Sequence, residues 1–393
     1  MKLLALALGA ALAPSALAWG AAGHEIVATI AQIHLHPQVR DALCSILPKQ
    51  ANCQLAPVAA WADMVRRQYP ETGPMHYINP RNDEPGGPTS HCEYGEHGWY
   101  NEDVNVLTAI MNKTQGLIDG EGDITLRFLV HFLGDLHQPL HLTGRDKGGN
   151  GALFRWEGRA RNLHSIWDSG IITKNIRELS NYTSPLPSKQ IEDSLPPNAI
   201  FDPYVRWIVW EGIREWWRDD VEGWLACPDS GDPYPHSSVG RFAPSKQGKP
   251  AHRAPWLEGL VNAGHLAALS LPDTLRGVVA PLLPVPNASY EGFNRRLLAN
   301  HPSKLAARGE KTSFPACPYT WSKSIHGINC QYAWPREYTG TGPLIELDTP
   351  EYIGHIDGDK VLERLLAQGG LRLAKILNRV IGKGEVSDLY IDY

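Results

Sequence analysis

The pattern of apolar and polar positions is most unusual between residues 131 and 141. This segment reads HFLGDLHQPLH and is apolar except for three histidines, one aspartate and one glutamine. His131 and Asp135 stand four positions apart, which places both side chains on one face of a helix. Pro139 lacks a backbone donor and clashes with the preceding turn. The helix is therefore predicted to end before Pro139, with His141 beyond its end.

This pattern favours a metal site. A single histidine on an apolar face is often an ordinary core residue, but several buried ionisable groups are costly unless they are paired or bind a metal. A second helix-spaced pair follows in NLHSIWDSG, where His164 and Asp168 are four residues apart. Histidine nitrogens and carboxylate oxygens are ligands of hydrolytic zinc sites. The two pairs together predict a metal centre without cysteine ligands.

The first 18 residues are predicted to be a secretory signal peptide. MKLLALALGAALAPSALA has one lysine, a short run of leucine and alanine, and a small-x-small triplet directly before Trp19. The segment is too short to span a membrane, and no later apolar run approaches about 18 residues. We expect a mature protein that starts at Trp19, is secreted or vacuolar, and has no membrane segment.

The rest of the chain is expected to form one domain with insertions. Its 393 residues would allow two or three domains, but it has no internal repeat and no long run of charge. Residues 228–255 and 281–318 are rich in Pro, Gly, Ser and Lys. Such composition is typical of loops. The predicted domain is therefore residues 19–393, with surface insertions at about 228–255 and 281–318.

The net charge and the cysteine content limit how the protein could bind a substrate and which covalent cross-links it could form. The formal net charge is −5, so no global basic field attracts nucleic acid, and a phosphate substrate would have to be held locally by metal. Six cysteines in an exported chain favour disulfides, and there is no Cys-x-x-Cys motif. Asn112, Asn181 and Asn287 begin Asn-x-Ser/Thr sequons and are candidate glycosylation sites.

Upstream segments supply further candidate ligands. His24 and Glu25 resemble the start of a metalloprotease helix, but residue 28 is alanine where the second histidine would be required. Asp63 and His76 are candidates as well, although the first can be a solvated helix residue and the second an ordinary loop histidine. The chain has no Gly-x-Ser-x-Gly motif, which argues against a serine hydrolase.

The order of these motifs resembles that of a known family. WG at the mature N-terminus is followed by GHEIVATIA, WAD, HYIN, HFLGDLHQPLH, GGN and NLHSIWD, and the late segments WSKSIHGINC and GLRLAKILN resemble the family's last helices. The family is the trinuclear-zinc nucleases of fungi and plants, the S1/P1 type. The resemblance implies a mainly α fold, a single helical domain with long loops around a cleft that holds three zinc ions.

The resemblance also implies a ligand for each zinc ion. Trp19 would bind the first ion through its α-amine and carbonyl oxygen, and Asp135 would bridge the first ion and the second. The ligand set has nine members: Trp19, His24 and Asp135 for one ion, Asp63, His76, His131 and Asp135 for its neighbour, and His141, His164 and Asp168 for the third. His137 matches no ligand position and is expected to support the ligands or to lie at the surface.

The activity implied is that of an endonuclease that hydrolyses phosphodiester bonds of single-stranded DNA and RNA, leaves five-prime phosphates, and has three-prime nucleotidase activity. Metal ions that share a carboxylate activate water for in-line attack on phosphorus. Asp63, as a metal ligand, and Arg66, as a partner of the phosphoryl charge, are the candidate catalytic residues. A zinc phospholipase C of related scaffold and a non-catalytic secreted zinc-binding protein are the alternatives.

Substrate contacts are implied in the same way. Tyr77 would stack on a nucleobase and Asn79 would read its edge, with Lys147 and Asn150 in the same substrate site. Stacking on tyrosine needs an unpaired base, which favours single strands. Lys147 stands where some members have an apolar residue, and Asn79 where many have aspartate, so the base preference stays open.

The resemblance guides the disulfide pairing only in part. Cys92 with Cys330 fits the family's long-range bridge, and Cys44 with Cys53 is a local pair. Cys227 with Cys317 would then join the two insertions. We expect a monomer.

Overall fold

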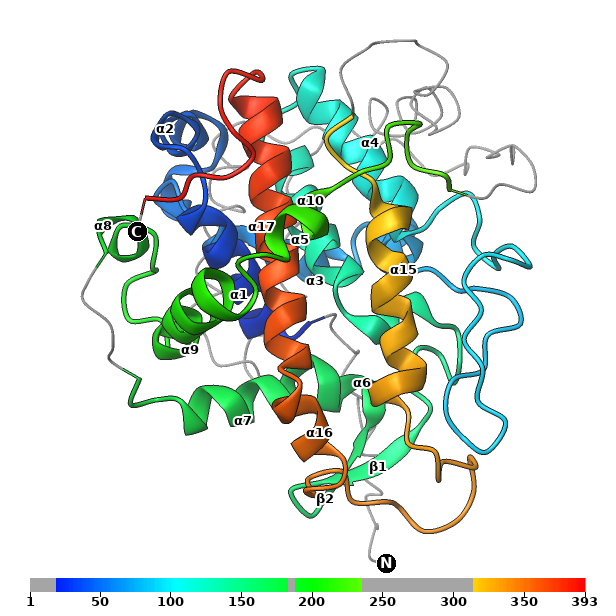
Figure 1. Ribbon diagram of the computed structural model, residues 1–393. Coiled ribbons are helices and arrows are strands. Elements are labelled where there is room, and N and C mark those ends of the chain that lie inside the picture. The colour runs from blue at the N-terminus through cyan, green and yellow to red at the C-terminus, as the bar shows by residue number, and fades with distance from the viewer. Residues whose placement is uncertain (1–18, 183–187, 235–313, 393) are drawn as a thin grey trace, which may run out of the picture.

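Helix α17 (Val361–Ile381) runs through the centre of the molecule, and other helices pack around it (Figure 1). The computed structural model describes residues 19–182, 188–234 and 314–392. This part of the chain is mainly helical, as predicted, and the one sheet within it is an antiparallel hairpin of two strands. The hairpin pairs Leu153 with Asn162 and Trp156 with Arg159.

The described elements follow one another along the chain as follows. The α-helices are α1 (Ala21–Ile33), α2 (Pro37–Ile46), α3 (Trp61–Val65), α4 (Val106–Ile118), α5 (Asp123–Leu136), α6 (Leu163–Ser165), α7 (Ile171–Glu178), α8 (Lys189–Glu192), α9 (Asp202–Trp207), α10 (Val221–Leu225), α15 (Pro318–Ile328), α16 (Ile353–Gly358) and α17. The 3-10 and π-helical segments are η1 (Lys49–Ala51), η2 (Ala56–Val58), η3 (Pro70–His76), η4 (Pro139–Leu142), η5 (Ile166–Gly170), η6 (Ile208–Trp216) and η8 (Asn329–Ala333). The strands are β1 (Leu153–Trp156) and β2 (Arg159–Asn162).

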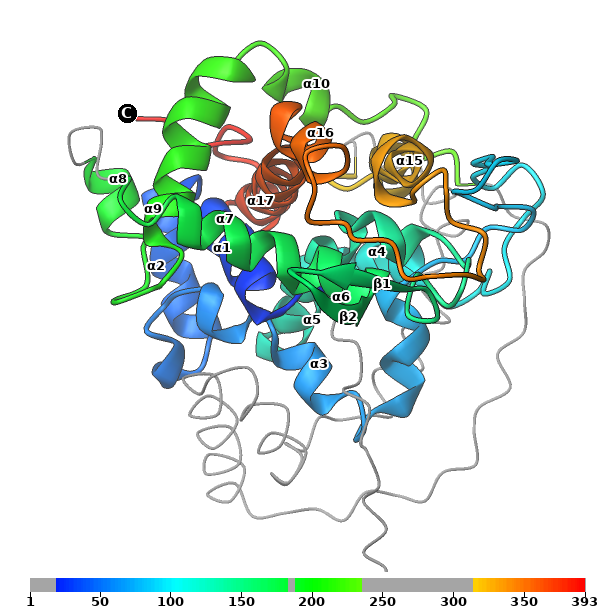
Figure 2. The same cartoon turned by 90° about the horizontal axis from the view of Figure 1, so that it is seen from below.

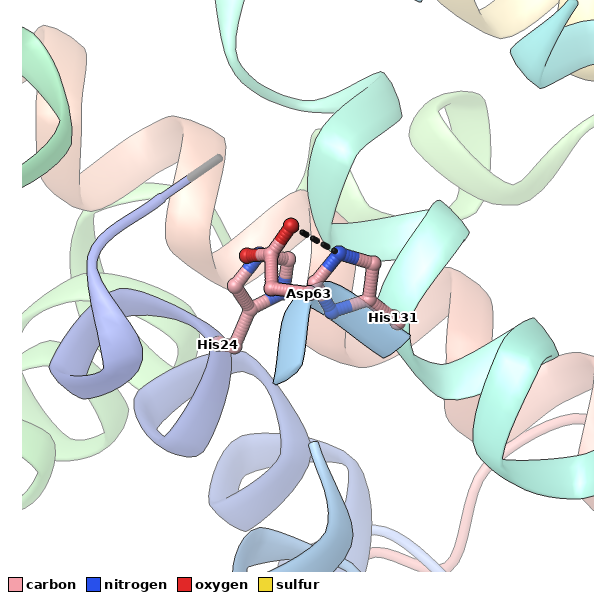
Figure 3. A group of neighbouring side chains, drawn as sticks. All are labelled: His24, Asp63 and His131. Atoms are coloured by element: carbon pink, nitrogen blue, oxygen red, sulfur yellow. Dashed lines mark ion pairs between the residues drawn. The ribbon is translucent and has the colours of Figure 1, made fainter. Parts of the chain in front are cut away.

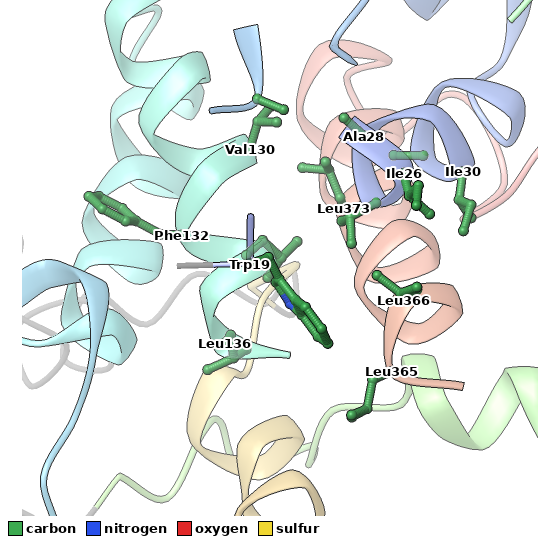
Figure 4. Packing of buried hydrophobic residues seen from close by; sticks show 14 of the residues in the cluster. Trp19, Ile26, Ala28, Ile30, Val130, Phe132, Leu136, Leu365, Leu366 and Leu373 are labelled. Carbon is green, nitrogen blue, oxygen red and sulfur yellow. The ribbon is translucent and has the colours of Figure 1, made fainter. Parts of the chain in front are cut away.

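Helix α1 crosses α17 at a glycine. A Cβ atom on Gly370 would lie 2.4 Å from Cγ2 of Ile30 and 3.0 Å from the carbonyl oxygen of Val27. A larger residue would therefore push the two helices apart. Fully buried apolar side chains of both helices surround this contact, among them Ile26 of α1 and Leu373 of α17 (Figure 4).

Helices α4 and α5 form a second packed pair, which lies below α15 and α17 in Figure 2. Asn105 begins α4 with a capping box: its side chain accepts hydrogen bonds from the backbone of Leu107 (3.0 Å) and Thr108 (3.1 Å). The Thr108 hydroxyl in turn accepts a bond from the Asn105 amide (3.1 Å). These bonds satisfy donors that a helix start leaves free. Among the described helices, none combines the length and apolar character needed to cross a membrane.

Three disulfides cross-link the described residues, and they join the pairs expected from the sequence: Cys44–Cys53, Cys92–Cys330 and Cys227–Cys317. The third joins residues on either side of 235–313, a range that contains most of the predicted insertions and lies outside the described residues. Ala316 and Cys317, at the end of the second predicted insertion, are buried directly before α15. These two residues therefore belong to the core.

The candidate glycosylation sites differ in access. Asn112 is half-buried on α4, its Oδ1 atom is buried, and Thr114 of the same sequon is fully buried. Asn181 is exposed after α7. Asn287 lies outside the described residues. Access for a glycan is therefore poor at Asn112 and good at Asn181.

Candidate metal centre

Asp135, buried on α5, is the residue around which the histidines gather. Its Oδ2 lies 2.9 Å from Nδ1 of His76 and 3.3 Å from Nε2 of His131, and its Oδ1 lies 3.4 Å from Nε2 of His24. These three histidines come from η3, α5 and α1. Because the two oxygens face different histidines, this carboxylate is suited to bridge two cations.

Asp63 adds a second carboxylate to this group. It is buried on α3, and its Oδ1 lies 3.6 Å from Nε2 of His131 and 3.7 Å from Nδ1 of His76. Figure 3 shows the Asp63 carboxylate beside the imidazoles of His24 and His131, whose rings stack with centroids 3.9 Å apart. Asp63 is therefore no solvated helix residue, and His76 is no ordinary loop histidine.

His141, His164 and Asp168 form a neighbouring buried group. Nε2 of His164 lies 3.2 Å from Oδ2 of Asp168 and 3.2 Å from Nε2 of His141. The helix spacing predicted for His164 and Asp168 is present, because α6 and η5 continue one another. Nδ1 of His141 is also 3.7 Å from Oδ1 of Asp135, so the two groups adjoin.

Helix α5 ends at Leu136, as predicted from Pro139, which begins the short helix η4. The change of direction sends His131 and Asp135 to one group and His141 to the other. One short motif thus supplies side chains to both groups, which accounts for the concentration of polar residues in it.

Backbone carbonyls orient three of the imidazoles. Nδ1 of His131 donates to Ala59 (2.8 Å), Nδ1 of His141 to His76 (2.6 Å), and Nδ1 of His164 to Gly148 (2.6 Å). Donation through Nδ1 turns the other ring nitrogen, Nε2, toward the centre. Second partners of this kind are a regular feature of metal-bound histidines.

Gln138 orients Asp168, a role that sequence analysis did not predict. Its Nε2 donates to Oδ1 of Asp168 (2.5 Å), and its Oε1 accepts from the amide of Leu140 (2.6 Å). Gln138 has no exposed surface. The bond occupies one carboxylate oxygen and leaves Oδ2 directed toward His164. The only signal in the sequence is that Gln138 is an amide within an otherwise apolar and ionisable motif.

Gly134 makes room for His24. A Cβ atom at residue 134 would lie 2.5 Å from Nδ1 of His24 and 2.9 Å from its Cε1. The glycine directly before Asp135 is therefore required by the approach of α1 to α5, and any side chain there would displace the imidazole.

Most imidazoles of the centre are neutral. Burial lowers the pKa of His24, His76 and His141 well below the usual histidine value, and repulsion from the positive charge of His131 adds to this effect. Burial also lowers the pKa of His164 to about 4. Neutral imidazole is the form that binds metals, so these side chains need not lose a proton first.

His131 and Asp135 hold a proton between them. Burial lowers the pKa of His131, but the carboxylates of Asp135 and Asp63 outweigh this and raise it to about 9. Burial raises the pKa of Asp135. A cation at this place would supply the positive charge and displace the proton.

The donor atoms fit metal ions. Several buried atoms of the two groups make no hydrogen bond: Nε2 of His24, Oδ1 of Asp63, Nε2 of His76, Oδ1 of Asp135 and Oδ2 of Asp168. Unpartnered buried polar atoms are costly. Three sets of donors lie close enough together to share a cation: His24, Asp63 and His131; His76, His131 and Asp135; and His141, His164 and Asp168. Nitrogen and carboxylate donors without sulfur suit zinc in hydrolytic sites.

The predicted N-terminal ligand lies close to these groups. Trp19 is fully buried, and Figure 4 shows its indole between Leu136 of α5 and Leu366 of α17. The amide of Gly20 donates to the carbonyl oxygen of Asp168 (2.8 Å). The start of the predicted mature chain is therefore anchored beside a residue of the centre.

Arg66 lies within electrostatic reach of the centre. It follows α3 directly, three residues after Asp63, and is partly exposed. After burial and the charge of His131, its guanidinium is the next cause of the lowered pKa of His76. A cation in this place can attract a phosphoryl group.

The predicted substrate residues lie in two neighbouring loops. Tyr77 and Asn79 follow His76 directly and are partly exposed. Gly144 packs against Asn79, because a Cβ atom there would lie 3.3 Å from Cβ of Asn79. The same turn carries exposed Lys147, whose carbonyl oxygen accepts a bond from the side-chain Nδ2 of Asn150 (2.9 Å).

A buried Asp83–His326 pair, which sequence reasoning missed, ties these loops together. Oδ1 of Asp83 lies 2.9 Å from Nε2 of His326 on α15, and Oδ2 accepts from the hydroxyl of Thr143 (2.6 Å). Cys92 is close by, but it is in the disulfide with Cys330 and offers no thiolate. The pair therefore holds the loops and the helix in place. No local spacing could reveal it, because the partners are 243 positions apart.

His137 is buried and faces away from the metal groups, so the surface alternative is wrong. Its Nδ1 donates to the carbonyl oxygen of Leu133 (2.7 Å), and its Nε2 accepts from Nη1 of Arg372 on α17 (2.7 Å). Arg372 also donates to the carbonyl oxygen of Trp224 (2.9 Å). His137 thus joins α5 to α17 by a hydrogen bond inside the core.

Comparison with known proteins identifies relatives of this region. The family model described as S1/P1 Nuclease matches residues 19–227. Endonuclease 2 of Arabidopsis thaliana is 35% identical over 234 residues, which cover 55% of this chain and 73% of the relative. Nuclease P1 of Penicillium citrinum is 34% identical over 204 residues, 50% of this chain and 74% of the relative. Nuclease S1 of Aspergillus oryzae is 34% identical over 171 residues, 41% of this chain and 57% of the relative.

Proposed function

The chain belongs to the S1/P1 nuclease family, and from this we propose that it is a secreted zinc-dependent endonuclease of single-stranded DNA and RNA. Family membership makes it a metal-dependent phosphodiesterase that acts on nucleic acid. One observation carries the proposal: eight buried side chains converge in two adjoining groups, namely His24, Asp63, His76, His131 and Asp135, and His141, His164 and Asp168.

Three zinc ions would be held by these eight side chains together with the α-amine and carbonyl oxygen of Trp19. Bridging by Asp135 is supported by its two oxygens, which face different histidines. When bound, such ions lower the pKa of water so that it attacks phosphorus in line, and they stabilise the leaving oxygen.

Side chains around the centre would bind and orient the substrate. Arg66 pairs with the charge on the phosphoryl oxygens. Tyr77 stacks on a base, Asn79 reads its edge, and Lys147 and Asn150 line the neighbouring loop. Cleavage releases five-prime phosphates, and a terminal three-prime phosphate is a further substrate of the same centre. Because stacking needs an unpaired base, the enzyme favours single strands.

The proposal includes export and processing before Trp19. Its support is that the match to the family model begins at Trp19 and that three disulfides are present, which are typical of secreted proteins. Residues 19–393 would form one monomeric domain, with insertions at about 228–255 and 281–318.

A comparison of substrates tests the proposed activity. Purified protein that starts at Trp19 is expected to degrade single-stranded DNA and RNA at least about tenfold faster than a duplex of the same sequence, because a duplex must first unstack a base. The alternatives give different results: a zinc phospholipase C would release phosphocholine from phosphatidylcholine, and a non-catalytic zinc-binding protein would turn over neither substrate. Equal rates on single and double strands would contradict the proposed preference.

Removal of metal is expected to lower thermal stability and abolish cleavage together. A ligand at a thousand times its Kd stabilises a protein by about 4 kcal/mol, which corresponds to a fall in Tm of about 5 °C on chelation for a domain of this size. Scanning calorimetry before and after chelation measures the fall, and zinc added back should restore both Tm and activity. An unchanged Tm, or metal analysis showing fewer than two zinc ions per chain, would contradict the trinuclear centre.

A further inference from the structure

Residues 77–81 form one side of a short two-chain ribbon. Pro80 and Trp99 make an antiparallel bridge, and the amide of Tyr100 donates to the carbonyl oxygen of Asn79 (2.9 Å). In such a ribbon, side chains alternate between the two faces, and directly opposed residues share a face. Asn79 and Tyr100 therefore point to the same side.

Burial follows this alternation. Ile78, Pro80 and Trp99 are buried and form the inner face of the ribbon. The outer face carries four side chains: Tyr77, Asn79, Arg81 and Tyr100. Arg81 and Tyr100 thus lie on the same face of the ribbon as Tyr77 and Asn79, the two residues proposed to bind a base.

Arg81 and Tyr100 interact with one another. Tyr100 is 68% exposed, and the guanidinium carbon of Arg81 lies 4.6 Å from the centre of its ring. Nε of Arg81 donates to the carbonyl oxygen of Trp99 (3.0 Å), which orients the guanidinium. An exposed aromatic ring next to an oriented cation is the combination that binds a base and a phosphate.

The ribbon is held in shape by Asn101. Its Oδ1 accepts from the amide of Asn79 (2.9 Å), and its Nδ2 donates to the carbonyl oxygen of Tyr77 (3.1 Å). Both chains of the ribbon are thereby joined through side-chain as well as backbone bonds. The outer face is preformed, so little conformational entropy is lost when a strand binds to it.

We propose that Tyr100 and Arg81 form a second nucleotide subsite, next to the one assigned to Tyr77 and Asn79. An unpaired base of the same strand stacks on Tyr100, and its phosphate pairs with Arg81. The inference rests on the proposed function, because it extends the path of a single-stranded substrate away from the metal centre. Stacking and charge pairing do not depend on base identity, so this subsite adds affinity without sequence preference.

Steady-state kinetics on a 12-nucleotide oligothymidylate test the subsite. Tyr100→Ala is expected to raise KM about five- to hundredfold with kcat unchanged, the effect of losing one stacked base. Tyr100→Phe, which keeps the ring, should restore KM to within about twofold of wild type. Tyr390→Ala is the matched control, because Tyr390 also pairs with an arginine, Arg40 at 5.9 Å. It lies near the C-terminus, on the other side of the molecule from the 77–101 loop (Figure 1), and should behave as wild type.

The outcomes separate this subsite from the activity on which it rests. If the wild type fails to cleave the oligonucleotide, the proposed function is wrong and the subsite falls with it. If the wild type cleaves it and Tyr100→Ala leaves KM unchanged, or Tyr100→Phe is as weak as Tyr100→Ala, the subsite alone is wrong and the Arg81–Tyr100 pair is only a surface contact. Equal melting temperatures of the variants exclude misfolding as the cause of a raised KM.

Discussion

A chain with one extra residue before Trp19 is expected to fold but to cleave single-stranded DNA at least about a hundredfold more slowly than the chain that starts at Trp19. The proposed ligand is the α-amine of Trp19, whose reference pKa of about 7.7–8.0 would fall on metal binding. An added residue turns this amine into an amide nitrogen and displaces the chelating carbonyl oxygen. Disturbed metal sites lose activity by about ten- to a hundredfold even when the ligands themselves remain.

The structure explains why the extended chain should still fold. The Trp19 indole is buried between α5 and α17, and the Gly20 amide is bonded to Asp168. Neither contact requires a free α-amine. The test uses a protein with an N-terminal extension that a protease removes directly before Trp19. The same preparation can then be assayed before and after the α-amine of Trp19 is released. Recovery of activity on cleavage, at constant circular dichroism, supports the ligand. Wild-type activity in the uncleaved protein would show that Trp19 only packs in the core.

The contacts among several candidate ligands could be predicted from sequence because these residues follow local rules. His131 with Asp135 and His164 with Asp168 share a helix face through their four-residue spacing, and the structure places each pair in contact. The end of α5 before Pro139 could also be predicted locally, because proline lacks the backbone donor that a helix requires. His76 could have been an ordinary loop histidine by its position alone. Its place in the metal centre was predicted from the resemblance of the ordered motifs to the nuclease family.

The supporting contacts could not be predicted, because they join distant segments. Gln138 reaches Asp168 across 30 positions, and Asp83 reaches His326 across 243. The position of His137, whether in the interior or at the surface, stayed open in the sequence analysis. Helix periodicity alone does not show which other helix a side chain will contact. The packing of α17 against α5 supplies that neighbour, Arg372.

Asp135→Asn is expected to reduce cleavage of single-stranded DNA by about a thousandfold or more. The amide is nearly isosteric with the carboxylate, but its nitrogen cannot ligate a metal, and the negative charge that would offset the two proposed cations is lost. Loss of about 4 kcal/mol of transition-state stabilisation corresponds to a thousandfold in rate, and a metal ion that polarises its substrate supplies several kcal/mol. Because one carboxylate faces His24 through Oδ1 and His76 and His131 through Oδ2, two ions should be affected together.

Metal content distinguishes a bridge from a ligand of a single ion. If Asp135 bridges, the purified variant should retain about one tightly bound zinc ion, held by His141, His164 and Asp168; a variant that retains two shows that Asp135 serves one ion only. Asp119→Asn, at the exposed end of α4, makes the same chemical change away from the centre and should keep full activity and full zinc content. The neutral amide also removes one of the two carboxylate charges that raise the pKa of His131, so the pKa of this imidazole should be lower in the metal-free variant than in the metal-free wild type. NMR titration of His131 measures this difference, and an unchanged pKa would show that the charge of Asp135 does not raise the pKa of His131.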